Sequence, residues 1–157
     1  IGNFTPDEAE DFLAGLTGIL GSGSGLLIGV DLKKDVDVLH AAYDDADGVT
    51  AAFNLNLLSR INRELGANFD LNMFRHRAVY SEELSRVEMH LVSQKTQTVT
   101  IANKSFNFAL GEHVHTESSH KYSVSEFRGL CSRAGYVPVA TWTDRNDLFS
   151  VHYFTAE

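Results

Sequence analysis

The sequence is poor in cysteine, in proline and in basic residues. Its 157 residues include one Cys, two Pro and one Trp, and 13 Lys and Arg stand against 21 Asp and Glu, so the formal net charge is -8. This balance excludes a nucleic-acid backbone as a partner, because phosphate binding requires clustered Lys and Arg. A single cysteine, Cys131, forms no internal disulfide, and we therefore expect a cytoplasmic location. No apolar run approaches the length of a membrane span or a signal-peptide core, and we expect no membrane partner.

The composition that remains is that of a folded domain. Hydrophobic residues make up 43% of the chain and charged residues 22%, which is enough apolar material for a core. The chain opens on Ile1 without a methionine. We expect the numbering to begin partway through a larger structural unit.

The first 35 residues predict a helix followed by a buried strand. Thr5 and Glu8 form a capping box around Pro6, and apolar residues then recur at helical spacing to Leu20. The Gly/Ser run at 21–25 is a connector, since a phosphate loop requires the opposite order of strand and helix. The short apolar run 26–30 is typical of a strand buried on both faces of a parallel sheet. Ligands bind beyond the carboxyl ends of such strands, where Asn3 is also expected.

The middle of the chain predicts helices and then strands. Residues at helical spacing predict a short helix that begins at Val36. A longer helix is predicted from Val49 to Leu65, with Gly66 as its C-cap. Asn54 on that helix is expected on a solvated or helix-packing face. The period then changes to two, which predicts an antiparallel meander of strands at 75–80, 87–92, 98–101 and 106–108. Met89 in the second of these is a core residue or a wall against a planar ring.

The stretch from Gly111 to Ser123 gathers histidines, an acid and hydroxyls more densely than any other. If it is extended, alternation places His113, His115, Glu117 and Ser119 on one face. A second capping box, Ser123 with Glu126, begins a helix that ends before Gly135, and two strands joined by a polar turn complete the chain. The layout is α/β at both ends with an α+β insert between them.

This polar row is compatible with three kinds of site. His113 and His115, with Glu117 or His120, could supply the ligands of a divalent metal in a non-catalytic binding domain, although two alternating histidines are a weak signature. Nucleophilic catalysis has less support, because Ser119 lacks an elbow motif and Cys131 lies within a helix. A site for a small zwitterion fits best. In that interpretation Glu117 and Ser119 bind an imidazole or ammonium group, and Tyr43 and Asn3 a carboxylate or amine.

Five blocks of the sequence resemble a known family. They are Ile1-Gly2-Asn3-Phe4; Leu27-Ile28-Gly29-Val30-Asp31-Leu32 with Lys34-Asp35; Ala42-Tyr43-Asp44-Asp45 with Gly48 to Asn54; Asn62-Arg63-Glu64-Leu65-Gly66-Ala67; and His115-Thr116-Glu117 with Ser119, Lys121 and Tyr122. Together they resemble the histidine-specific methyltransferases. These S-adenosylmethionine-dependent enzymes trimethylate the α-amino group of histidine to hercynine in ergothioneine biosynthesis.

The resemblance implies a fold and a domain division. The fold is α/β, the carboxyl-terminal half of a Rossmann-like methyltransferase sheet with an inserted α+β substrate-binding domain that contains the antiparallel meander. Residues 1–34 would be the end of strand four, a helix and strand five of the methyltransferase domain. Residues 35–121 would be the inserted domain, and residues 122–157 the final helix and two strands. The missing part would leave apolar sheet surface open, through which the fragment is expected to dimerise.

The resemblance also implies ligands and site residues. By matching positions, Asn3 and Tyr43 would hold the carboxylate and amine end of histidine, Glu117 and Ser119 its imidazole, and Met89 would line the ring. No metal site and no catalytic base are implied. The family's glycine-rich loop and ribose-binding acid lie upstream of Asn3, so S-adenosylmethionine would be bound mainly by residues outside this chain. The fragment alone is expected to be inactive.

Overall fold

A computed structural model describes residues 1–157, which form two compact units. Unit 1 comprises Ile1–Asp35, Ser81–Arg86 and Ser118–Glu157, and unit 2 comprises Val36–Tyr80 and Val87–Glu117. Four α-helices are present, and none combines the length with the apolar character needed to span a membrane. The expected domain boundaries at residues 34 and 121 stay predictions.

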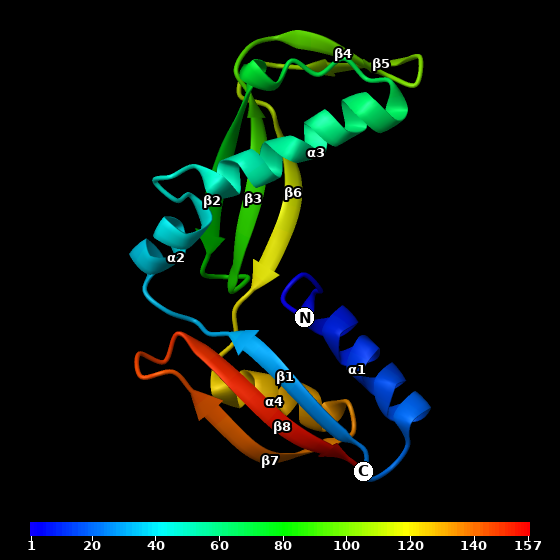
Figure 1. The fold of residues 1–157 in the computed structure, drawn as a ribbon, viewed down its shortest axis with the longest axis vertical. Helices are drawn as coiled ribbons and strands as arrows, with labels where there is room; N and C mark the ends of the chain where they lie inside the picture. Colours follow the sequence, from blue (N-terminus) through cyan, green and yellow to red (C-terminus); the bar gives the residue numbers. More distant parts are fainter. The chain divides into compact units, whose positions relative to one another are not determined.

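Unit 1 is built on a three-stranded antiparallel sheet. Its strands are β1 (Gly25–Asp31), β7 (Tyr136–Thr143) and β8 (Phe149–Ala156), and β8 lies between the other two (Figure 1). His152 of β8 pairs with Ile28 of β1 and with Thr141 of β7. The register of β7 shifts between Pro138 and Ala140, because proline has no N–H to donate to the ladder.

Two capped helices cover one face of this sheet. Both predicted capping boxes are confirmed: Thr5 caps α1 (Pro6–Leu20) and Ser123 caps α4 (Val124–Arg133). The core between helices and sheet includes Leu13, Phe127 and Phe154, each 0% exposed. Residues 2–4 form a turn rather than the end of a strand, closed by a hydrogen bond from Phe4 N to Ile1 O at 3.2 Å.

The prediction that residues 26–30 form a strand buried on both faces of a parallel sheet is wrong for this chain. The strand exists, but β1 pairs antiparallel with β8 and its residues alternate in burial. Val30 lies in the core at 2% exposure, whereas Leu27 on the opposite face is 66% exposed. The physical reason is that α1 and α4 pack on one side only.

Unit 2 contains two helices and all or the greater part of each of five strands. The helices are α2 (Val36–Tyr43) and α3 (Val49–Leu65), followed by the 3-10 turn η1 (Leu71–Met73). Asp45 receives hydrogen bonds from Val49 N and Thr50 N at 2.9 and 2.8 Å, and Gly66 ends α3 at φ 62° as predicted. The core of this unit lies between α3 and the strands and comprises Leu58, Phe69, Phe74, Leu91 and Val99.

The strands of the middle region form where the alternation predicted them. They are β2 (Phe74–Ser81), β3 (Arg86–Ser93), β4 (Gln97–Ile101) and β5 (Lys104–Phe108), and β6 (His113–His120) follows (Figure 1). They do not form one continuous meander. The order of the larger sheet is β2-β3-β6, while β4 and β5 pair separately. The interruption lies at Ser93, whose N–H donates to Glu112 O and whose carbonyl accepts from Gly111 N, so the end of β3 pairs with the segment before β6.

Candidate functional site

The polar row of residues 113–119 lies on β6, as the alternation predicted. Its two histidines contact His90 of β3. His113 Nδ1 lies 2.9 Å from His90 Nδ1, and the His115 ring stacks on His90 with centroids 4.9 Å apart. Burial lowers the pKa of His90, against a hydrogen bond with Glu88 that raises it. The chain contains no group of three or more His, Cys, Asp or Glu side chains that could hold a metal ion, so the metal alternative gains no support.

Glu117 lies in a small cavity of unit 2, about 210 Å³ in volume, between β6 and α3. The cavity also contains Phe53 and Leu57, which are 65% and 40% exposed, and Arg60, which is paired with Glu64 at 3.0 Å. The Glu117 carboxylate makes no hydrogen bond or ion pair within the chain. An unpaired acceptor beside apolar side chains is suited to an N–H donor on a flat ligand.

Tyr43 is positioned by a buried hydrogen-bond network in unit 2. It ends α2, and its carbonyl accepts a hydrogen bond from His76 Nε2 at 2.8 Å. Asn54 Nδ2 contacts His76 Nδ1 at 2.9 Å and donates to His90 O at 3.2 Å. With Nδ1 as the acceptor, Nε2 carries the proton, which is the tautomer that Tyr43 O requires. The network ties the end of α2 to α3, β2 and β3.

Asn54 and His76 were not identified from the sequence. Asn54 is 3% exposed rather than solvated, and His76 is 5% exposed. Asn54 lies four residues before the core residue Leu58 and therefore on the same face of the helix, and this spacing was the available signal that Asn54 is buried.

Met89 is a core residue at 4% exposure on β3. Its carbonyl accepts a hydrogen bond from Thr116 Oγ1 at 2.9 Å, which joins β3 to β6 immediately before Glu117. Unit 2 therefore brings the strands of Met89 and Glu117 side by side.

Unit 1 brings Asn3 and Ser119 into one neighbourhood. The turn that carries the exposed Asn3 is bound to the end of β6 through a hydrogen bond from His120 N to Gly2 O at 2.7 Å. A Cβ at Gly2 would lie 3.3 Å from His120 O, which is a tight contact, and 3.4 Å from Ser119 Oγ, so the turn lies directly against this end of β6. Ser119 Oγ accepts a hydrogen bond from Lys121 Nζ at 2.8 Å, which fixes its position.

Lys121 is a fully buried cation that sequence reasoning missed. Its ammonium forms an ion pair with Asp31 at 2.7 Å, and Asp31 also pairs with Lys34. Burial alone would raise the pKa of Asp31, but the hydrogen bonds from Lys121 and Lys34 hold that pKa below its usual value. The ion pair anchors the end of β6 at the carboxyl end of β1.

Cys131 is not suited to nucleophilic chemistry. It is 0% exposed, and burial raises the pKa of its thiol to about 12. A thiol that stays protonated is a poor nucleophile.

Comparison with known proteins decides the family. Residues 1–156 match the profile of the SAM-dependent, histidine-specific methyltransferases. The chain belongs to this family. It is 43% identical over 146 residues to a histidine N-alpha-methyltransferase of Mycolicibacterium smegmatis and 40% identical over 146 residues to one of Mycobacterium tuberculosis. Each alignment covers 92% of this chain and 46% of the relative, so the chain spans about half the length of these curated relatives.

The fold also matches part of the chain of a solved methyltransferase. The CcbJ methyltransferase from Streptomyces caelestis has 11% sequence identity and a TM-score of 0.50, with 99% of this chain and 56% of that chain covered. At this identity the likeness concerns the fold alone. The histidine-specific methyltransferase chain is thus a mixed α/β structure with antiparallel sheets.

Proposed function

We propose that this chain is the amino-acid-binding part of an S-adenosylmethionine-dependent N-methyltransferase that trimethylates the α-amino group of histidine to hercynine. The family match over residues 1–156 is the observation that carries the proposal. We further propose that the chain is the carboxyl-terminal half of a Rossmann-like methyltransferase sheet, with the 35–121 region inserted in it. Catalysis would belong to the full-length, cytoplasmic protein and not to this chain alone.

The proposed substrate contacts divide by chemistry. Glu117 and Ser119 are the proposed imidazole contacts, with the Glu117 carboxylate accepting a hydrogen bond from an imidazole N–H. Support comes from the unpaired Glu117 carboxylate in its cavity and from the Lys121 ammonium that holds Ser119 Oγ. Asn3 and Tyr43 hold the carboxylate and amine end, and Met89 lines the ring.

The bound cofactor would supply an electrophilic methyl group. The residues of this chain would hold the substrate amine in line with that group, and such positioning accounts for much of the rate. The amine must be neutral to carry a lone pair. Because Glu117 is assigned to the imidazole end, we give it a role in specificity and not in deprotonating the amine.

Calorimetry on the full-length protein tests the Glu117 assignment. Glu117→Gln keeps the shape of the side chain but removes its charge, and a lost charge-assisted hydrogen bond should weaken histidine binding by about tenfold or more. Affinity for S-adenosylmethionine should stay the same. Glu82→Gln is the matched control, since Glu82 is exposed on a turn. Unchanged histidine affinity in Glu117→Gln would contradict the assignment.

Competition with tyrosine and tryptophan distinguishes a histidine enzyme from the same machinery acting on another amino acid.

Dimerisation of the isolated chain would proceed through the uncovered sheet face of unit 1, where Leu27 and Trp142 are 66% and 55% exposed. Sedimentation of the chain with and without Leu27→Asp tests that contact.

A further inference from the structure

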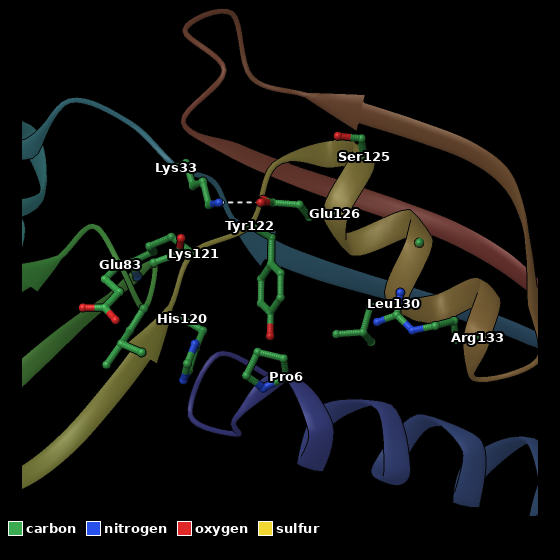
Figure 2. A pocket seen from close by; sticks show the side chains of 13 residues that line it. Pro6, Lys33, Glu83, His120, Lys121, Tyr122, Ser125, Glu126, Leu130 and Arg133 are labelled. Atoms are coloured by element: carbon green, nitrogen blue, oxygen red, sulfur yellow. Dashed lines mark hydrogen bonds and ion pairs between the residues drawn. The ribbon is translucent and has the colours of Figure 1, made fainter.

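Unit 1 contains a second, larger cavity, about 590 Å³ in volume. It lies among the start of α1, the turn at residues 83–85, the segment 120–122 and one side of α4 (Figure 2). Its volume falls within the range of small-molecule sites, about 300–1,000 Å³. Pro6, Leu130 and the ring of Tyr122 give it apolar walls. The side chains proposed to contact histidine do not line it.

Two residues that line this cavity each have a buried polar atom without a partner. Tyr122 is 6% exposed and His120 is 5% exposed, yet Tyr122 Oη and His120 Nε2 make no hydrogen bond. Figure 2 shows the Tyr122 phenol reaching toward Pro6 and the His120 imidazole extending from the same segment to one side of it. Buried polar groups are paired in almost all proteins, because leaving them unpaired costs stability. An acceptor supplied by a ligand would satisfy both atoms.

Both side chains are neutral at physiological pH and can donate hydrogen bonds. Burial raises the pKa of Tyr122, so the phenol keeps its proton. Burial lowers the pKa of His120, and the nearby Arg86 and Lys121 cations lower it further. A neutral imidazole with its proton on Nε2 then donates alongside the Tyr122 hydroxyl.

The charges near His120 favour an anionic acceptor, although the lysines and the arginine of the lining are themselves ion-paired, Lys33 with Glu126, Lys121 with Asp31 and Arg133 with Glu10. The one acid that acts on His120, Glu8, is opposed by two cations, Arg86 and Lys121. The carboxylate of Glu126 is already bound by Lys33 Nζ at 2.5 Å and by Ser123 N at 2.7 Å.

Glu83, the other acid of the lining, does not oppose such a ligand at the two donors. Figure 2 shows its carboxylate pointing away from Tyr122.

We propose that this cavity binds a small carboxylate with an apolar, ring-sized body, and that the carboxylate accepts hydrogen bonds from Tyr122 Oη and His120 Nε2. The apolar body lies against Leu130 and Pro6. The site is separate from that of Ser119, because Ser119 and His120 are neighbours on β6 and their side chains point to opposite faces. It serves a ligand other than the methyl acceptor.

Titration of the full-length protein with phenylacetate, followed by saturation-transfer NMR, tests the proposal. Phenylacetate should bind, and phenylacetamide, which has the same ring without the charge, should bind at least tenfold more weakly. Tyr122→Phe removes only the hydroxyl and should weaken phenylacetate binding about tenfold or more. Tyr136→Phe is the matched control, because Tyr136 Oη is also buried without a partner but Tyr136 does not line the cavity. This variant should bind phenylacetate with the affinity of the unaltered protein.

The position of the probe supplies the second measurement. Nuclear Overhauser contacts between the phenyl ring and the Leu130 methyl groups are expected. The proposal is overturned by absence of binding to the full-length protein, by equal affinity for acid and amide, by equal affinity in Tyr122→Phe, or by binding without contacts to Leu130. Binding to the isolated chain alone would likewise refute it, since another segment of the protein would then occupy the cavity.

Discussion

Replacing Lys121 by methionine should destabilise the protein strongly, because it leaves a carboxylate without its buried partner. The Lys121 side chain is 0% exposed and its ammonium lies 2.7 Å from Asp31, whose side chain is 31% exposed. Breaking a buried ion pair from one side costs about 3–5 kcal/mol. Asp31 keeps Lys34 as a second partner and some contact with water, so we expect the lower end, about 3 kcal/mol.

An exposed ion pair in the same unit is the control. Lys33 and Glu126 lie 2.5 Å apart, but their side chains are 34% and 50% exposed. Such pairs contribute about 0–1 kcal/mol, so Lys33→Met should change stability little although its ion pair is the shorter one. Urea denaturation followed by far-UV circular dichroism gives both free energies of unfolding.

The double variant isolates the interaction. If the pair acts as a unit, Lys121→Met combined with Asp31→Asn should cost less than the sum of the two single variants. The reasoning is refuted if Lys121→Met costs no more than Lys33→Met, because burial would then not determine the strength of the pair.

Three further predictions concern titration, reactivity and capping. Burial lowers the pKa of His90, His120 and His152 below the usual 6.5, so the unfolded chain binds more protons than the folded one, and the free energy of unfolding should fall as the pH drops below about 6.5; a flat stability profile from about pH 7 to 5 would contradict this. Burial raises the pKa of Cys131 to about 12, so a thiol-reactive dye should label it in urea and not in the native state at neutral pH, and rapid native labelling would be inconsistent with its burial. Ser123→Ala removes an N-cap and should cost about 1 kcal/mol in urea denaturation, whereas an unchanged midpoint would show that α4 does not depend on its cap.

Local chemistry allowed most helices and strands to be predicted from the sequence. Thr5 and Ser123 each precede a glutamate at the third helical position, and both capping boxes form. Gly66 ends α3 in the left-handed conformation that favours glycine. Alternation along 113–119 predicted β6 correctly, because a strand period of two leaves a clear signal.

Features that depend on distant partners could not be predicted. The run 26–30 is apolar at every position, which hides the fact that only one face of β1 is covered. Lys121 is charged and adjacent in sequence to polar residues. Nothing local indicated that its side chain would be buried in an ion pair with Asp31, which is far away in the chain. The cavity beside Tyr122 is likewise formed by segments from four separate parts of the sequence.

The candidate site was predicted only in part by physical reasoning. Glu117 belongs to an alternating polar row, and that pattern is visible in the chain. Physical reasoning offered Tyr43 and Asn3 as contacts of a carboxylate or amine and Met89 as a core residue or a wall against a ring, and the family resemblance then assigned all three to histidine, since a single tyrosine, asparagine or methionine carries little signal of its own. Their roles as substrate contacts stay predictions.

Incubation of the full-length protein with histidine and S-adenosylmethionine tests the central claim most directly. Mass spectrometry of the products should show histidine carrying three methyl groups, and fragmentation should place all three on the α-amino nitrogen. Absence of methyl transfer to histidine, or transfer to an imidazole nitrogen, would contradict the proposed function.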